Sequence, residues 1–131
     1  MFKTSILIET MQEDLRVALV QTHLHWENPI ANRQYLQERF QELKTPVDLI
    51  VLPEMFSTGF TMTPQNIDEV EAEQTLFWMQ EMAKKYKTVV VGSQVFSEEG
   101  RYFNRLFCVN AVGVIGEYDK RHTFTLAGED R

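Results

Sequence analysis

A carboxylate and an ammonium group in this chain each follow a stretch that predicts a β-strand. Glu54 comes directly after the apolar residues 49–53, and Lys120 lies just beyond the predicted strand 114–118. In α/β proteins, side chains at the carboxyl ends of strands commonly form the functional site. A carboxylate can carry a proton and an ammonium can stabilise a developing negative charge, so the two predict acid–base chemistry on a polar bond. An ion pair that only joins two strand ends would explain the same residues equally well.

A thiol nucleophile that could complete such a site is not evident in this chain. Cys108 is its single cysteine, and it lies within the apolar residues 106–109. A cysteine in that setting usually packs as a small hydrophobic side chain. We therefore expect Cys108 to be structural, with a nucleophile in an unfamiliar geometry as the alternative.

Other candidate sites are weaker. His23 and His25 alternate near Glu27, but no third residue has a convincing metal-ligand spacing, so we expect exposed loop residues and no metal. Ser57 lacks the G-x-S-x-G pattern of a serine hydrolase, and no glycine-rich phosphate loop is present. Phe60, together with Phe124 further along the chain, could wall a small substrate pocket or could equally be an ordinary core residue.

The elements that must position these residues alternate between strands and helices before they end in hairpins. Asn28-Pro29 is typical of a helix start, and residues 68–71 resemble a capping box. Apolar side chains at helical spacing predict that the second helix buries one stripe: Ala72, Leu76, Met79, Ala83 and Tyr86. The predicted strands are 15–21, 48–53, 88–96, 102–111 and 114–118, and the predicted helices are 29–44 and 68–86.

This order predicts an α/β fold, a mixed β-sheet with two helices on one face. The strands around residues 49–52 and 89–91 are apolar at successive positions, which is typical of burial on both faces. Nothing left in the chain could cover the second face. We therefore expect half of a layered sandwich, with residues 15–131 as the amino-terminal part of one domain. Residues 1–14 are expected to be a disordered extension, with a short edge strand as the alternative.

Composition excludes several classes of function. The formal net charge of −6 over 131 residues argues against non-specific nucleic-acid binding. No apolar stretch approaches the length of a membrane span. One cysteine rules out an internal disulfide and fits a reducing compartment, so we expect a cytoplasmic protein.

Four fragments in this order and spacing resemble the nitrilase, or carbon–nitrogen hydrolase, superfamily, and within it the bacterial ω-amidase branch. They are residues 17–21 (VALVQ), 52–60 (LPEMFSTGF), Gly92-Ser93 and 118–122 (YDKRH). The resemblance implies a nitrilase-like αββα sandwich, of which this chain is the amino-terminal half. It also implies a Glu–Lys–Cys triad in that chain order.

Carried onto this sequence, the resemblance implies that Glu54 is the general base and Lys120 stabilises the tetrahedral intermediate. Glu129 matches a second glutamate near the site of many members. His122 follows Lys120 by two residues and is a candidate hydrogen-bond partner, with plain structural packing as an equal alternative. The family's nucleophilic cysteine lies some tens of residues beyond the lysine, whereas this sequence ends eleven residues after Lys120.

The function implied is hydrolysis of a small amide, an ω-amide of a dicarboxylic or 2-oxo acid, without a cofactor. The expected partners are that substrate and further copies of the protein, as a homodimer or higher homo-oligomer. The alternative is a catalytically inactive module that acts by association with itself or a partner.

Overall fold

The computed structural model describes residues 14–122. They form one five-stranded sheet in the order β1-β2-β3-β4-β5. The first three strands pair in parallel, and the last three pair antiparallel. The mixed sheet predicted from the sequence is therefore confirmed. The strands are β1 (Val17–Leu19), β2 (Leu49–Val51), β3 (Val89–Glu98), β4 (Arg101–Val109) and β5 (Val114–Asp119).

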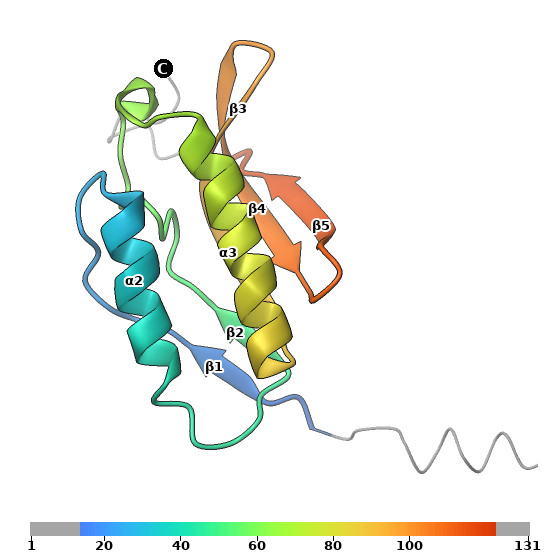
Figure 1. Ribbon diagram of the computed structural model, residues 1–131. Helices are drawn as coiled ribbons and strands as arrows, with labels where there is room; N and C mark the ends of the chain where they lie inside the picture. Colours follow the sequence, from blue (N-terminus) through green and yellow to red (C-terminus); the bar gives the residue numbers. More distant parts are fainter. Residues whose placement is uncertain (1–13, 123–131) are drawn as a thin grey trace, which may run out of the picture.

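Two helices cover one face of this sheet, as predicted (Figure 1). They are α2 (Pro29–Phe40) and α3 (Val70–Tyr86), and a short 3-10 helix, η1 (Pro64–Asn66), precedes α3. The core lies between the helices and the sheet, because apolar side chains from both layers are buried there. Its fully buried members include Leu36, Phe40, Ile50, Phe56, Met79, Ala83, Val90 and Val109.

Helix α2 begins where the sequence predicts but ends four residues earlier. The Asn28 side chain accepts a hydrogen bond from the Ala31 amide, and Pro29 is the first helical residue. After Phe40 the chain tightens, and the amides of Gln41 and Leu43 bond to carbonyls three residues back. Such turns satisfy the last carbonyls of a helix without extending it.

Helix α3 buries a broader face than predicted, because it packs against both the sheet and α2. Met79 and Ala83 are buried as expected, whereas Ala72, Leu76 and Tyr86 are only partly buried. The stripe prediction missed three further buried side chains that lie beside it on the helix: Thr75, Trp78 and Met82.

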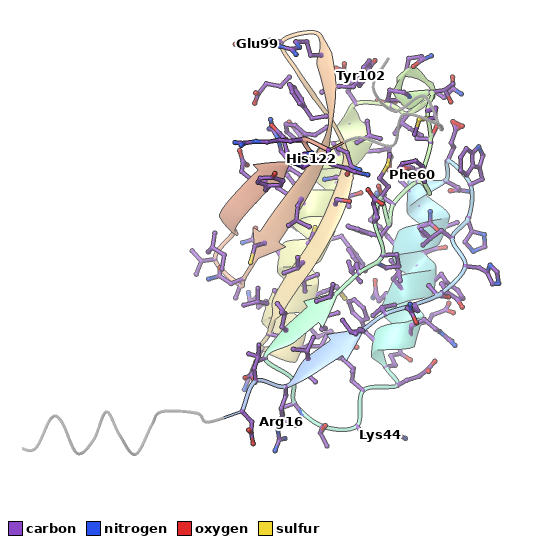
Figure 2. The ribbon with its side chains drawn as sticks, turned by 180° about the vertical axis from the view of Figure 1, so that it is seen from behind. Arg16, Lys44, Phe60, Glu99, Tyr102 and His122 are labelled. Carbon is purple, nitrogen blue, oxygen red and sulfur yellow. The ribbon has the colours of Figure 1, made fainter. Side chains whose placement is uncertain are left out.

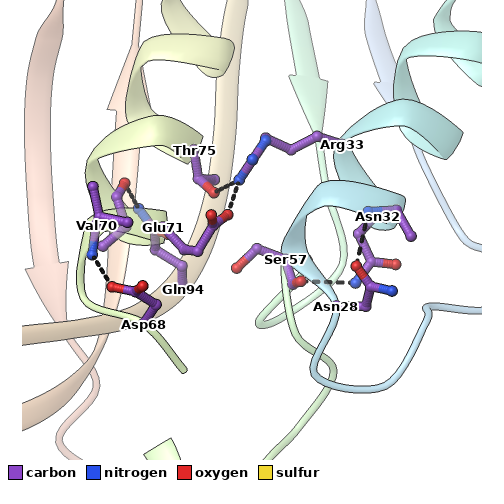
Figure 3. A network of polar contacts seen from close by, with 11 residues as sticks. Asn28, Asn32, Arg33, Ser57, Asp68, Val70, Glu71, Thr75 and Gln94 are labelled. Atoms are coloured by element: carbon purple, nitrogen blue, oxygen red, sulfur yellow. Dashed lines mark hydrogen bonds and ion pairs between the residues drawn. The ribbon is translucent and has the colours of Figure 1, made fainter. Parts of the chain in front are cut away.

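The predicted capping box at the start of α3 does not form. The Asp68 carboxylate accepts from the Val70 amide, but Glu71 turns away to an ion pair with Arg33 of α2, 2.8 Å from its guanidinium. Arg33 also donates to the Thr75 hydroxyl (Figure 3). A contact between the two helices therefore replaces the local cap.

The second face of the sheet, called here the open face, is not covered by either helix. Figure 2 views the molecule from this side, with the strands in front of the helices. Val17, Leu19, Leu106 and Tyr118 are exposed there, and their strand positions alternate with those buried under the helices. In residues 14–122, no helix has the length and apolar character needed to cross a membrane.

Candidate active site

The two charged residues singled out in the sequence meet in space. Lys120 Nζ lies 2.8 Å from Glu54 Oε2, although the residues are 66 positions apart. The Glu54 side chain is 47% exposed and that of Lys120 is 29% exposed. The pair is therefore reachable by a small molecule from the open side of the sheet.

A third residue joins this contact. Asn104, in the middle of β4, donates from Nδ2 to the same Glu54 Oε2 at 2.9 Å. Its main-chain carbonyl accepts from the Lys120 amide at 3.0 Å. Asn104 thus contacts both charged residues, one through its side chain and one through its backbone.

Glu54 is held by the segment that follows β2 and runs alongside β3. The Leu52 amide donates to the Val91 carbonyl, and the Phe56 amide donates to the Ser93 carbonyl. Between them, the Met55 amide donates to Ser93 Oγ at 2.9 Å. Met55 adopts a left-handed conformation, with φ of 49°. That conformation is uncommon for a residue with a side chain, and it persists because the flanking hydrogen bonds fix it.

A glycine on β3 makes room for this segment. A Cβ at Gly92 would lie 2.6 Å from the ring of Phe56, which is fully buried. The next residue of the turn is also fixed, since Asn32 of α2 donates to the Ser57 carbonyl at 2.7 Å (Figure 3). Asn32 is itself fully buried. The turn that carries Glu54 is therefore clamped from the sheet and from a helix.

Lys120 follows a strand end that is fixed by a buried arginine. Arg105 of β4 makes two hydrogen bonds to the carboxylate of Asp119, at 2.6 and 3.0 Å. Its guanidinium also lies over the rings of Phe96 and Phe103. The hydrogen bonds from Arg105 lower the pKa of Asp119, and burial opposes that shift. The contact between Asp119 and Arg105 therefore fixes the end of β5 on one face of the sheet, and the next residue, Lys120, lies on the opposite face.

The remaining candidate residues fall into different places. Phe60 lies beside the pair, with Lys120 Nζ 5.0 Å from the centre of its ring. His122 is exposed and makes no hydrogen bond or ion pair with the described residues. Figure 2 labels both residues. Phe124 and Glu129 lie outside the described residues, as does nearly all of the 1–14 extension.

Cys108 lies on the open face but away from the pair. It is half-buried on β4, opposite Val91 and Gly116. It lies four positions along β4 from Asn104, which is about 13 Å in an extended strand. His23 and His25 are exposed loop residues. Within residues 14–122, no three His, Cys, Asp or Glu side chains are grouped as metal ligands would be.

No role was predicted for Asn104 or Ser93, although Ser93 is part of one of the four family-like fragments. Each stands in a predicted strand directly before a second polar residue, Arg105 or Gln94, so residue type alone did not single it out. Periodicity could not identify their partners, because Glu54 and Met55 lie 50 and 38 residues away.

Comparison with known proteins identifies the family of this chain. The carbon-nitrogen hydrolase family model matches residues 16–131. The omega-amidase YafV of Escherichia coli K12 is 32% identical over 115 residues, which cover 88% of this chain and 44% of that protein. The 2-oxoglutaramate amidase of Bacillus subtilis is 26% identical over 118 residues, covering 86% and 45%.

Solved structures give the same result. XC1258 from Xanthomonas campestris, described as a CN-hydrolase superfamily protein with an arsenic adduct in the active site, superposes with a TM-score of 0.82 at 32% identity. The match covers 91% of this chain and 45% of that one. The chain thus spans less than half the length of these relatives. It belongs to the carbon–nitrogen hydrolase family of the nitrilase superfamily.

Proposed function

We propose that this chain provides the carboxylate and the ammonium of an amidase whose thiol nucleophile comes from a segment outside its 131 residues. The observation that carries the proposal is the 2.8 Å contact between Glu54 and Lys120 beside the open face. Family membership supports it. So does the position of Cys108, about 13 Å along β4 from Asn104, which is too far to serve this pair. The chain together with the thiol-bearing segment is called the assembled amidase.

The two groups divide the work of amide hydrolysis. Glu54 accepts the proton of the thiol as the sulfur attacks the amide carbon. Lys120 offsets the negative charge that develops on the amide oxygen. Glu54 then returns the proton to the departing nitrogen, which leaves as ammonia with a thioester behind. Water hydrolyses the thioester by the same route: Glu54 takes a proton from the water and passes it to the departing sulfur.

The substrate proposed is a small ω-amide of a dicarboxylic or 2-oxo acid. Support comes from relatives named omega-amidase and 2-oxoglutaramate amidase. Ammonia release should therefore be faster from such an ω-amide than from an amide of equal length without the distal carboxylate. Equal kcat/KM for the two substrates would contradict the substrate class and leave the amidase proposal intact.

Substitution of each charged residue tests the reaction itself. In the assembled amidase, Glu54→Gln and Lys120→Ala should each lower kcat at least about 100-fold, because each removes a group that acts in the transition state. Matched controls are Glu99→Gln in the exposed β3–β4 turn and Lys84→Ala on the exposed side of α3. Full activity of either site variant would show that the pair is only a structural contact.

A second candidate function is association without catalysis. The exposed apolar side chains of the open face favour it, because soluble monomers rarely expose a large contiguous apolar patch. The 131-residue chain should then form a homo-oligomer by size-exclusion chromatography with light scattering. Replacement of Leu19, the most exposed of these side chains, by a charged residue should dissociate the oligomer. A monomer at micromolar concentration that binds no hydrophobic dye would contradict this function.

A further inference from the structure

Asn104 occupies a position from which it can control the geometry of the charged pair. It lies on β4 between Val95 of β3 and the residue after β5. Its side chain alternates with the buried Arg105 and so shares the open face with Leu106. The amide of this side chain has a specific partner, the Glu54 carboxylate.

The hydrogen bonds on that carboxylate are uneven. Oε2 accepts both from Lys120 Nζ at 2.8 Å and from Asn104 Nδ2 at 2.9 Å. No donor among residues 14–122 bonds to Oε1. The two bonds to Oε2 restrict rotation of the carboxylate, and a bond to an ionised group is stronger than one between neutral groups.

We propose that Asn104 is a positioning residue that, with Lys120, immobilises Oε2 and leaves Oε1 as the oxygen that exchanges protons. The inference rests on the proposed amidase function. It assigns the two oxygens of Glu54 separate tasks: one anchors the side chain, and the other accepts the thiol proton and returns it to the leaving nitrogen. Without Asn104, a single bond from Lys120 would leave the carboxylate free to rotate, and the reactive geometry would be populated less often.

The amide also spares Lys120 from serving as the sole anchor of Glu54. An ammonium carries three donors, and the one that holds Oε2 shares this oxygen with the Asn104 amide. The backbone bond from the Lys120 amide to the Asn104 carbonyl keeps the lysine at this distance. A side-chain substitution at Asn104 preserves that backbone bond.

The experiment compares Asn104→Leu and Asn104→Asp in the assembled amidase. Leucine keeps the approximate volume but has no donor, and aspartate keeps the shape but adds a negative charge beside Glu54. Loss of one hydrogen bond to a charged group should lower kcat by about 10- to 100-fold with KM nearly unchanged. Aspartate should be at least as harmful as leucine, because it also competes for Lys120.

The matched control is Asn110→Leu, the same substitution in the β4–β5 turn. The Asn110 side chain caps that turn by accepting from the amides of Val112 and Gly113. The Asn110→Leu variant should be less stable towards urea but should retain its kcat. Urea unfolding of all three variants separates loss of folding from loss of geometry.

A milder effect of Asn104→Asp than of Asn104→Leu would overturn the proposal, because a merely structural polar site tolerates the isosteric polar residue better. Retention of kcat in both variants would also overturn it. If Glu54→Gln is also fully active, the amidase function has failed. If Glu54→Gln is inactive while both Asn104 variants keep their kcat, only the role of Asn104 has failed. Should Asn104→Leu not fold, the Asn104→Asp result decides alone: unchanged kcat refutes the proposal, and a loss that leaves KM and stability unchanged supports it.

Discussion

Replacement of Gly92 by alanine should disturb the turn that carries Glu54 without touching a charged group. The added Cβ would lie 2.6 and 2.7 Å from two carbons of the Phe56 ring and 3.1 Å from the Leu52 Cβ. Carbon atoms in contact prefer about 3.5–4.0 Å, so the overlap with the ring is about 1 Å. Phe56 is fully buried, and its ring can move only by pushing its own backbone or its neighbours.

The expected cost is that of overpacking a core, about 1–3 kcal/mol in the free energy of unfolding. Urea unfolding of the purified chain, followed by tryptophan fluorescence, measures it. The ring of Trp78 lies 6.0 Å from that of Phe56, so the signal reports on the site of the overlap. In the assembled amidase the same variant should lower kcat, because Phe56 follows Glu54 by two residues.

Two further variants make this test specific. Gly116→Ala on β5 is the matched control, since its Cβ would meet only the Cys108 Cβ at 3.8 Å. It should leave stability unchanged within about 0.5 kcal/mol. Phe56→Leu in the Gly92→Ala background should cost less than the sum of the two single changes, because the smaller side chain vacates the space. Additive costs, or a Gly116→Ala variant that is less stable than Gly92→Ala, would refute the steric reasoning.

Two other predictions concern the clamps around the site. Because the folded-state pKa of Asp119 lies below its usual value through hydrogen bonds from Arg105, the stability that this pair contributes is present above the unfolded Asp pKa of about 3.9. This contribution to stability is lost as the pH falls below about 3.9 and through the folded-state pKa of Asp119. The Asp119→Asn variant should therefore lose less stability than the unsubstituted chain between pH 5 and 2, measured by urea unfolding. An equal loss in both proteins would contradict this. Asn32→Leu should cost about 2–4 kcal/mol, because it leaves the buried Ser57 carbonyl and both backbone groups of His25 without their partner; a loss below about 1 kcal/mol in the same assay would show that water replaces those bonds.

The order and type of the elements were predictable from local pattern. Alternating strand and helix signals, with Asn28-Pro29 as a helix start, lead to a mixed sheet with two helices on one face. The residues at which the elements begin and end were less predictable from the sequence, because tertiary contacts determine them. Glu71 is the clearest case: its spacing from Asp68 favours a local cap, and the ion pair with Arg33 across the helices wins instead.

Glu54 and Lys120 could be proposed from residue type and position at strand ends, and the structure brings them together; their catalytic role stays a prediction. The residues that hold them could not be proposed in the same way. Asn104, Ser93 and Asn32 each form a hydrogen bond to a segment 25 to 50 residues away. No periodicity encodes such a distance, so only the folded arrangement of the strands reveals these partners.

The contact between Glu54 and Lys120 joins the segment after β2 to the end of the last strand, with β3 and β4 lying between those strands in the sheet. Neither the parallel half nor the antiparallel hairpins can form it alone. A state in which β5 is detached would keep its helices and most of its core but would lose this contact, because the residues of β5 are exposed or only partly buried. The proposed role of the pair therefore depends on the docking of the final hairpin, and opening of that hairpin would separate the two charges while the core stays packed.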